Sequence, residues 1–371
     1  MYSFDPTDEQ KLIIQTARDF AAKHIRPYAH DSDEKSDLPE GFLAASWELG
    51  LATGAIPESL GGAGLPRSAV TGALLVEELA CGDLPLALAM LVPALVAYPL
   101  VDYGSEPQKK QILPVLTAGS FPRVTAALVE PSMNYDAADL ATHAVRAESA
   151  GGHYVISGHK CLVPLGTAAE TFLIYAAEGG AGLDNVQAFI VPRGARGLTV
   201  SEKEKNMGLR AVDSVELVLE GVHVPPSSRL GEAKGIDFAR VMSYSRIAIA
   251  AMGVGLARAA YDYAREYAKE RKAFGEPIAS RQAIAFMLAE MAVEIDAARL
   301  LVWEAAWQLD KGNTATKETY LARMYSDAMA LKVTDNAVQV LGGHGYIRDN
   351  PVEAWLRHAR GLSTFDGMAT V

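Results

Sequence analysis

Three residues in the second half of the chain, Arg271, Gly342 and Gly343, could together bind a diphosphate. A guanidinium offers paired hydrogen-bond donors to a diphosphate, and glycines let the backbone approach such a group closely. The two glycines follow a predicted helix instead of opening one after a strand, so they do not form the fingerprint of NAD-binding proteins. The alternative interpretation is that Arg271 is a solvated helix charge and that the glycines end a helix.

Other kinds of chemistry find little support in the sequence. The eight histidines and two cysteines lack the spacing of metal ligands, so we expect no metal. Cys81 and Cys161 lie far apart, which argues against a disulfide framework and favours a reducing cytoplasm. The sequence offers no Ser-His-Asp arrangement that would indicate a catalytic triad. With 34 basic against 45 acidic residues, the formal charge of -11 would repel nucleic acid and anionic membranes.

The elements that must position these residues fall into three parts. A capping box of Thr7 and Gln10 opens an apolar-faced helix that we expect to end at Pro27. Further helices are predicted at residues 41–49 and 68–80. Short β-rich runs without helices between them then predict an antiparallel barrel or sandwich. These runs are Tyr154–Ile156, Phe172–Tyr175, Ala188–Val191 and Val215–Leu219.

Long helical periodicity returns after Gly235, and short loops between the helices predict an antiparallel four-helix bundle. The runs are Phe238–Arg271, Ser280–Asp310, Thr316–Leu341 and a shorter one from Val352. The predicted fold is therefore α+β and multidomain. It has an N-terminal all-α domain at 1–122, a middle β domain at 123–231 and a C-terminal four-helix bundle at 232–371.

One segment, Leu84 to Val101, is almost wholly apolar over the length of a bilayer span. Pro85, Pro93 and Pro99 interrupt it, which favours buried helices with proline-made turns over a membrane helix. Residues 1–10 carry acidic side chains and no apolar core, so we expect no signal or transit peptide.

Short motifs occur in one order along the whole chain. They are Pro57-Glu58 with Gly61-Gly62-Ala63-Gly64, Glu130-Pro131 with Asp136, Gly158-His159-Lys160, Met207-Gly208, Val224-Pro225, Arg271 with Phe274-Gly275 and Gln282, Gln339 with Gly342-Gly343-His344-Gly345-Tyr346, Pro351-Val352-Glu353, and Arg357-His358-Ala359-Arg360. With the order of the three parts, this set resembles the FAD-dependent acyl-CoA dehydrogenases. A fold alone would not decide function, and the motifs carry the resemblance.

The resemblance implies that FAD lies between two subunits. One subunit's bundle reaches the diphosphate and adenosine of the neighbour's cofactor, and the implied residues are Arg271, Phe274, Gln282, Gln339, Gly342 and Gly343. The flavin ring would lie on the same subunit's β domain, against Leu128, Val129, Leu162 and Pro164. This half departs from the family pattern, because Val129, Asn134 and Tyr135 replace residues that usually include hydroxyls. Leu162 and Pro164 replace a tryptophan and a threonine.

The family reaction removes the acyl α-proton with a carboxylate while the β-hydrogen leaves as hydride. Two family positions can hold that base, and they are Ser245 and Asp366 here, so Asp366 is the implied catalytic residue. Tyr135, Arg246, Phe365 and Gly367 are the implied substrate-binding residues. Aspartate is one methylene shorter than the usual glutamate, about 1.5 Å less reach, and such a misplacement can cost on the order of 10²-fold in rate. The alternative is that Asp366 is only a turn carboxylate beside Gly367.

The implied function is α,β-desaturation of an acyl-CoA thioester with FAD. An electron-transfer flavoprotein would be the acceptor, and the assembly would be a homotetramer or a heterotetramer with a homologous subunit. One alternative is a non-catalytic subunit that lends its bundle residues to a catalytic neighbour. Another is a related flavin oxidase for a small carbon acid, with Asp366 as its base. An acyl-CoA binding protein without redox activity is a further possibility.

Overall fold

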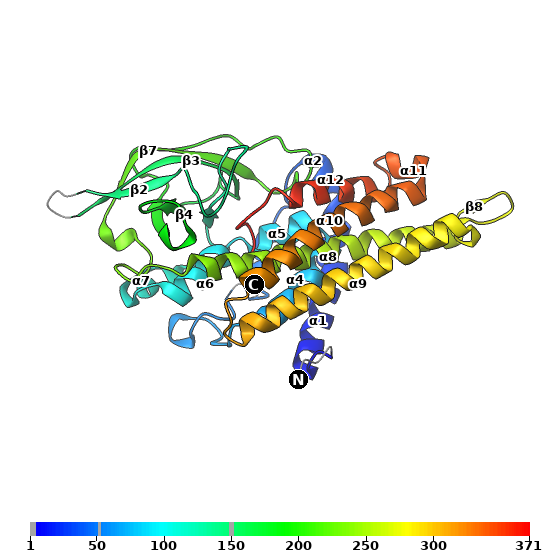
Figure 1. The fold of residues 1–371 in the computed structure, drawn as a ribbon, viewed down its shortest axis with the longest axis horizontal. Coiled ribbons are helices and arrows are strands. Elements are labelled where there is room, and N and C mark those ends of the chain that lie inside the picture. Colours follow the sequence, from blue (N-terminus) through cyan, green and yellow to red (C-terminus); the bar gives the residue numbers. More distant parts are fainter. Residues whose placement is uncertain (1–4, 51–52, 148–151) are drawn as a thin grey trace.

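The computed structural model describes residues 5–50, 53–147 and 152–371, and Figure 1 shows a sheet at one end and long helices that run to the other. The N-terminal helices pack beneath and between these two parts. This order of helical, β and helical parts is the predicted one. The sheet therefore meets the long helices near the middle of the molecule.

The first helix, α1 (Asp8–Phe20), begins at the predicted capping box, in which Thr7 and Gln10 exchange side-chain and backbone hydrogen bonds. The prediction that this helix stops at Pro27 was wrong. The chain continues through a π-helical turn and a 3-10 turn, where proline takes an N-terminal position and no helical N–H is lost. The remaining helices of this part are α2 (Ala29–Lys35), α3 (Phe42–Trp47), α4 (Ala69–Gly82), α5 (Leu84–Leu91), α6 (Ala94–Tyr103) and α7 (Glu106–Leu116), with a 3-10 turn at Glu58–Leu60.

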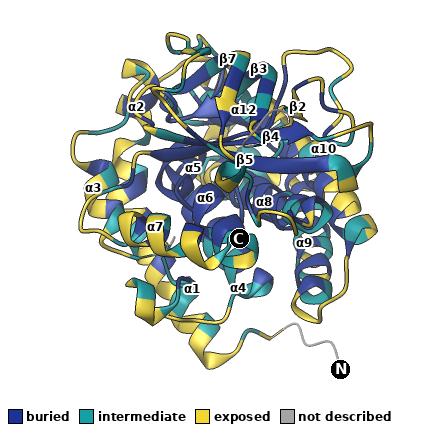
Figure 2. Ribbon diagram, turned by 90° about the vertical axis from the view of Figure 1, so that its left-hand side faces the viewer, coloured by how far each residue is buried: buried dark blue, intermediate teal, exposed yellow. Residues whose placement is uncertain are grey.

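The apolar segment from Leu84 forms α5 and α6, whose residues are almost all buried, and Figure 2 shows both helices in the interior. Among the described residues, no single helix is long and apolar enough to cross a bilayer. The pair α5 and α6 meets that test only together and is bent by 41° between the two helices.

The middle part is one seven-stranded sheet with the order β1-β4-β2-β3-β7-β6, and β5 pairs with β4. Four pairings are antiparallel, as predicted, but β1 and β2 each pair with β4 in parallel. Residue pattern alone does not give strand direction, so these two pairings were not predicted. The strands are β1 (Val124–Ala127), β2 (His143–Arg146), β3 (Tyr154–Pro164), β4 (Thr171–Ala177), β5 (Val186–Pro192), β6 (Leu198–Val200) and β7 (Ser214–Val224).

The C-terminal part is built on α8, which is buried along most of its length and contacts α4, α9, α10 and α12. The bounds of α10 are those that the sequence predicts. A small hairpin between α8 and α9 projects from the end of the molecule farthest from the sheet (Figure 1). The elements are α8 (Phe238–Glu270), β8 (Lys272–Ala273), β9 (Glu276–Pro277), α9 (Gln282–Asp310), α10 (Thr316–Leu341), α11 (Gly343–Tyr346) and α12 (Val352–Leu362).

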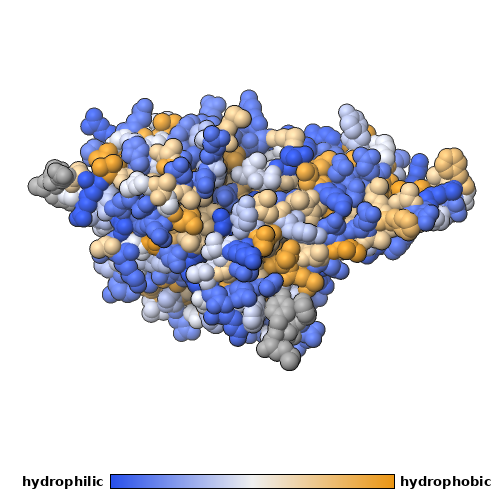
Figure 3. All heavy atoms as spheres, in the orientation of Figure 1, coloured by the Kyte–Doolittle hydropathy of each residue, from blue (hydrophilic) through white to orange (hydrophobic). Residues whose placement is uncertain are grey.

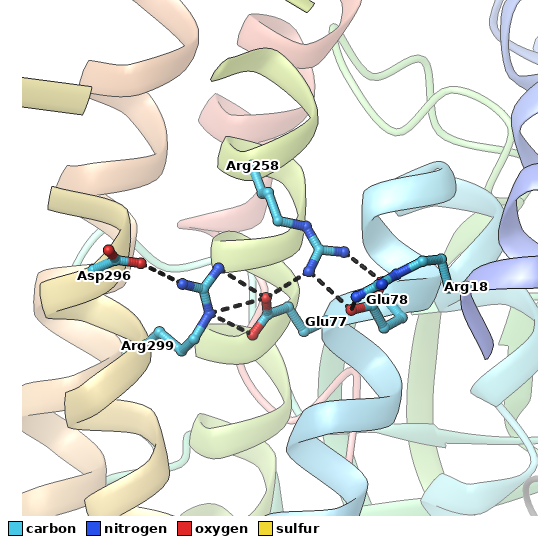
Figure 4. A network of polar contacts seen from close by, with 6 residues as sticks. All are labelled: Arg18, Glu77, Glu78, Arg258, Asp296 and Arg299. Atoms are coloured by element: carbon cyan, nitrogen blue, oxygen red, sulfur yellow. Dashed lines mark hydrogen bonds and ion pairs between the residues drawn. The ribbon is translucent and has the colours of Figure 1, made fainter. Parts of the chain in front are cut away.

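A network of buried charges ties the N-terminal helices to the bundle (Figure 4). Glu77 and Glu78 on α4 are 5% exposed each, which would be costly if they lacked cationic partners. Glu77 binds Arg258 of α8 and Arg299 of α9, both at 3.0 Å. Glu78 binds Arg258 at 2.6 Å and Arg18 of α1 at 2.9 Å. Four helices, α1, α4, α8 and α9, are thereby held in one arrangement.

Candidate functional site

A buried ion pair joins two motifs that the sequence analysis singled out separately. Lys160 on β3 is completely buried, and its Nζ donates to Glu130 Oε1 at 2.8 Å and to the carbonyl of Leu128 at 2.9 Å. Burial lowers the pKa of Lys160 to about 8. Burial alone would raise the pKa of Glu130, but the charge and hydrogen bond of Lys160, with a hydrogen bond from the backbone N–H of Thr142, outweigh it and lower that pKa. The pair fixes the end of β1 against β3.

The residues proposed for the flavin ring lie around this pair. Leu128 and Val129 follow β1 and are buried, and the Val129 carbonyl accepts the N–H of Cys161 at 2.9 Å. Leu162 has a φ of 54° at a register shift between β3 and β7, so the strand bulges at this point. The Pro164 carbonyl accepts the Thr125 hydroxyl at 2.6 Å. Four positions from two strands thus converge on one end of the sheet, and three of their side chains are aliphatic.

The segment that carries Asp366 packs directly against this end of the sheet. Gly367 has a φ of 69°, and a Cβ built on it would lie 2.5 Å from Leu128 Cδ2. Only glycine fits such a conformation at such a distance. The structure therefore brings the proposed base segment and a proposed flavin contact together, although they come from opposite ends of the sequence.

Arg323 on α10 holds the same segment from the other side. It is 7% exposed, and its Nη2 donates to the carbonyls of Leu362 at 2.9 Å and Phe365 at 3.2 Å. Burial lowers the pKa of Arg323 to about 10, while the nearby charge of Asp366 opposes that change and Arg246 adds to it. Sequence reasoning missed Arg323, because a lone arginine within a helical run resembles a solvated charge.

Of the other proposed substrate residues, Phe365 and Gly367 are the chain neighbours of Asp366, and Tyr135 lies within reach of its charge. Burial raises the pKa of the Tyr135 hydroxyl, and the charge of Asp366 raises it further. That hydroxyl is buried without a hydrogen-bond partner among the residues that the structure describes, and so is the hydroxyl of Ser245. The guanidinium of Arg246 lies 5.6 Å from the ring centre of Tyr320. Buried hydroxyls of this kind are available to a bound polar group.

A small cavity lies beside Ser245 and Gly367. Its volume is about 10 Å³, and its walls include Leu128, Ser245 and Gly367 together with side chains of α6 and α8. Ser245, one of the two family positions for the catalytic base, therefore borders this space, and Gly367, the neighbour of the other position, Asp366, borders it as well. Such a volume holds about one water molecule.

A separate cavity of about 450 Å³ lies at the far end of the bundle, beside the residues for which the sequence suggested diphosphate binding. Arg271, Gly342 and Gly343 all line it, beside Tyr267 and His344, which form a hydrogen bond with each other at 3.0 Å. A Cβ built on either glycine would have nothing within 4 Å, so the backbone there is open to a ligand. The cavity combines a cation with a glycine backbone that no side chain covers, which suits an anionic ligand.

The three remaining bundle positions do not line this cavity within the single chain. Phe274 lies at the tip of the projecting hairpin and is 95% exposed, with the guanidinium of Arg281 5.6 Å from its ring centre. Gln282 and Gln339 are also exposed. An exposed aromatic ring on a projecting hairpin is typical of a residue that contacts another subunit.

A larger cavity of about 640 Å³ lies between α10, α12 and the loop at Met207. Two of its cations already have carboxylate partners, since Lys332 binds Glu294 and Arg357 binds Asp33 and Glu353. Beside it, the backbone N–H of Leu209 donates to Nδ1 of the buried His358 at 3.0 Å. Burial lowers the pKa of His358 to about 3, so this ring is a neutral acceptor. The Met-Gly and Arg-His motifs therefore fix the sheet to α12.

Within the described part of the chain, no three His, Cys, Asp or Glu side chains form a group that could hold a metal ion. The chemistry that this arrangement can carry is proton transfer at Asp366 and anion binding at Arg271.

Comparisons with known proteins agree with the resemblance. Three family models match, namely the acyl-CoA dehydrogenase N-terminal domain at residues 7–120, the middle domain at 125–222 and the C-terminal domain at 234–371. A probable acyl-CoA dehydrogenase, YngJ of Bacillus subtilis, is 38% identical over 100% of this chain and 97% of its own length.

Solved structures give the same result. Butyryl-CoA dehydrogenase from Megasphaera elsdenii is 32% identical with a TM-score of 0.88, over 100% of this chain and 96% of its own. A glutaryl-CoA dehydrogenase from Mycobacterium smegmatis, solved in complex with FADH2, is 25% identical with a TM-score of 0.86, over 98% of this chain and 92% of its own.

Proposed function

The chain belongs to the acyl-CoA dehydrogenase family, and from this membership we propose that it desaturates an acyl-CoA thioester between the α and β carbons, with FAD as its cofactor. The observation that carries the proposal is the contact of Gly367 with Leu128, which places the carboxylate-bearing segment at the end of the sheet. A base and a hydride acceptor must lie on two sides of one acyl group, and this contact joins the elements that would supply both.

The residues present fit FAD at both ends. In our proposal, Leu128, Val129, Leu162 and Pro164 hold the flavin ring on its own subunit, through aliphatic contacts and backbone groups. Arg271, Gly342 and Gly343 of the neighbouring subunit bind the diphosphate, and the open backbone beside the glycines supports this role. Phe274, Gln282 and Gln339 extend the neighbour's contribution. When bound, FAD supplies a two-electron acceptor that takes the β-hydrogen as hydride.

The chain's own residues provide the proton chemistry. Asp366 accepts the α-proton on its carboxylate, and Arg323 holds the preceding carbonyl so that the carboxylate keeps its position. The hydroxyls of Tyr135 and Ser245 are buried without a hydrogen-bond partner among the described residues, so in our proposal they bind polar atoms of the thioester. The aliphatic walls exclude water, which strengthens the electrostatic contacts made inside.

We also propose that the chain works in an oligomer, as a homotetramer or with a homologous subunit. Large apolar side chains are exposed along one face of α9 and α10, and Figure 3 shows hydrophobic surface along this part of the molecule. On α9, successive members of this set are seven residues apart, so they share one helix face. The set is Phe286, Val293, Leu300, Tyr320, Leu321, Met324 and Tyr325.

Two further proposals follow from the chemistry. The reduced cofactor must pass on two electrons, and an electron-transfer flavoprotein is the acceptor that we propose. A reducing cytoplasm is the proposed location, since Cys81 and Cys161 are both free thiols.

The experiment that tests this function uses the purified chain and its Arg271→Gln variant. We expect yellow protein with near one FAD per chain, whose flavin absorbance bleaches when an acyl-CoA is added without oxygen. Arg271→Gln should weaken FAD binding about tenfold or more, since a charged hydrogen bond is lost. Arg265→Gln, near the end of α8, is the control, because Arg265 makes surface ion pairs and a contact with the Tyr261 ring but does not line the cavity at Arg271. Colourless protein that takes up no FAD would contradict the proposal.

A further inference from the structure

The four residues after Gly367 turn into the interior of the protein. Met368, Ala369, Thr370 and Val371 are 5%, 1%, 8% and 4% exposed. Val371 packs on α4, where a Cβ built on Gly72 would lie 2.5 Å from its own Cβ. A run of buried residues without helix or strand needs specific partners for its backbone and side chains.

This segment borders the small cavity beside Ser245. Ala369 and Thr370 line that cavity together with Leu95 and Pro99 of α6 and Met242 of α8. Ser245 and Gly367 border it as well. Because only about 10 Å³ is free, Ala369 and Thr370 leave little room for an acyl chain in the space bordered by α6, α8 and Gly367, the residue next to Asp366.

Arg67 holds the segment in place. Its Nε donates to the main-chain oxygen of Val371 at 2.7 Å, and its Nη2 donates to Thr370 Oγ1 at 3.0 Å. The guanidinium lies 4.4 Å from the ring centre of Tyr98 and 3.7 Å from that of Tyr244, and it also pairs with Asp102. The planar guanidinium interacts with both aromatic rings, and these contacts help to hold Arg67 in the position from which it binds the segment.

Building on the proposed function, we propose that residues 368–371, latched by Arg67, determine which acyl groups the site accepts. With the segment in place, the site admits only short acyl groups. A longer acyl chain binds when the segment withdraws, so its affinity is reduced by the free energy that the latch contributes. Weakening the latch therefore favours long acyl chains over short ones.

The test measures binding of S-butyl-CoA and S-octyl-CoA, thioethers that lack the acidic α-proton and so cannot be turned over. Dissociation constants come from calorimetry on the purified protein, the Arg67→Gln variant and the milder Thr370→Val variant. We expect wild type to bind the butyl thioether more tightly. Arg67→Gln should tighten S-octyl-CoA about tenfold, the equivalent of one or two lost hydrogen bonds, with little change for S-butyl-CoA. Thr370→Val should act in the same direction with a smaller effect.

Hydrogen exchange of the peptide that contains residues 366–371 provides the second measurement. S-octyl-CoA should speed exchange there, and Arg67→Gln should do so without ligand. Arg123→Gln, which removes only an exposed ion pair with Glu170, should change neither measurement. The proposal is overturned if both latch variants bind S-octyl-CoA as wild type does, or if S-octyl-CoA binds without faster exchange. These measurements need no turnover, so they separate this proposal from a failure of the proposed reaction.

Discussion

Gly367 and Leu128 touch so closely that a single methyl group at residue 367 would lie 2.5 Å from the leucine side chain. The contact joins the segment that carries Asp366 to the end of β1, where the flavin is proposed to lie. It also sets the position of Asp366, because Arg323 holds the adjacent Phe365 carbonyl on the other side. The contact between Gly367 and Leu128 is therefore expected to affect the reaction, through the position of Asp366, more than the overall fold.

Replacing Gly367 by alanine tests that geometry. The added Cβ clashes with Leu128 and disfavours the φ of 69°, so Asp366 should shift. A misplaced catalytic group of this kind costs on the order of 10²-fold in rate. Stopped-flow measurement of flavin reduction by acyl-CoA gives the rate. Gly119→Ala, where an added Cβ meets nothing within 4 Å, is the control, and equal rates for the two variants would rule out the steric argument.

The Lys160–Glu130 pair should be essential for stability. Lys160→Met leaves a buried carboxylate without its cation, which typically costs about 3–5 kcal/mol. The free energy of unfolding in urea measures this loss. The double variant Lys160→Met with Glu130→Gln removes the unpaired charge and should regain part of it. A loss below about 1 kcal/mol, the range of an exposed pair, would show that the pair is not needed.

Acid should destabilise the protein through His358. Burial depresses its pKa to about 3 in the folded state, against about 6.5 in the unfolded chain. Between these values the unfolded chain binds the extra proton, so falling pH favours unfolding by about 1.4 kcal/mol per pH unit. The charge of Asp33 opposes this depression, whereas Arg357 and Arg210 add to it.

His358→Asn keeps an acceptor near Nδ1 but cannot titrate. As the pH falls from 6.5 to 5, the free energy of unfolding of this variant should therefore decrease less steeply than that of wild type. The two slopes should differ by about 1.4 kcal/mol per pH unit. Substitution of the exposed His30 is the control. Parallel curves for wild type and His358→Asn would contradict the assignment.

Much of the fold follows from local pattern, as α10 illustrates. Its bounds, Thr316–Leu341, were predicted from apolar periodicity and the glycines that follow it. The parallel pairing of β1 with β4 was not predicted, because alternation along a strand does not specify the direction of its partner. The π-helical turn at Ala21–Ile25 and the 3-10 turn that contains Pro27 likewise leave no simple mark in the sequence.

The candidate site likewise combines residues that the sequence identified with contacts that only the structure reveals. Asp366, Leu128 and Gly367 were named from motifs, but their contact joins distant parts of the chain and only the structure reveals it. Arg323 and Arg67 gave no sequence signal, because each donates to main-chain oxygens that any residue type could provide and that lie far away along the chain. Roles that depend on backbone partners are the ones that sequence reasoning misses.

The reaction itself depends on Asp366 as the group that receives the α-proton. Asp366→Asn preserves shape and removes the base, so the most direct measurement is anaerobic flavin reduction by acyl-CoA in that variant, with FAD content verified. We predict that FAD remains bound and that the rate constant for flavin reduction falls by about 10²–10⁴-fold. Flavin reduction at the wild-type rate would contradict the proposed role of Asp366.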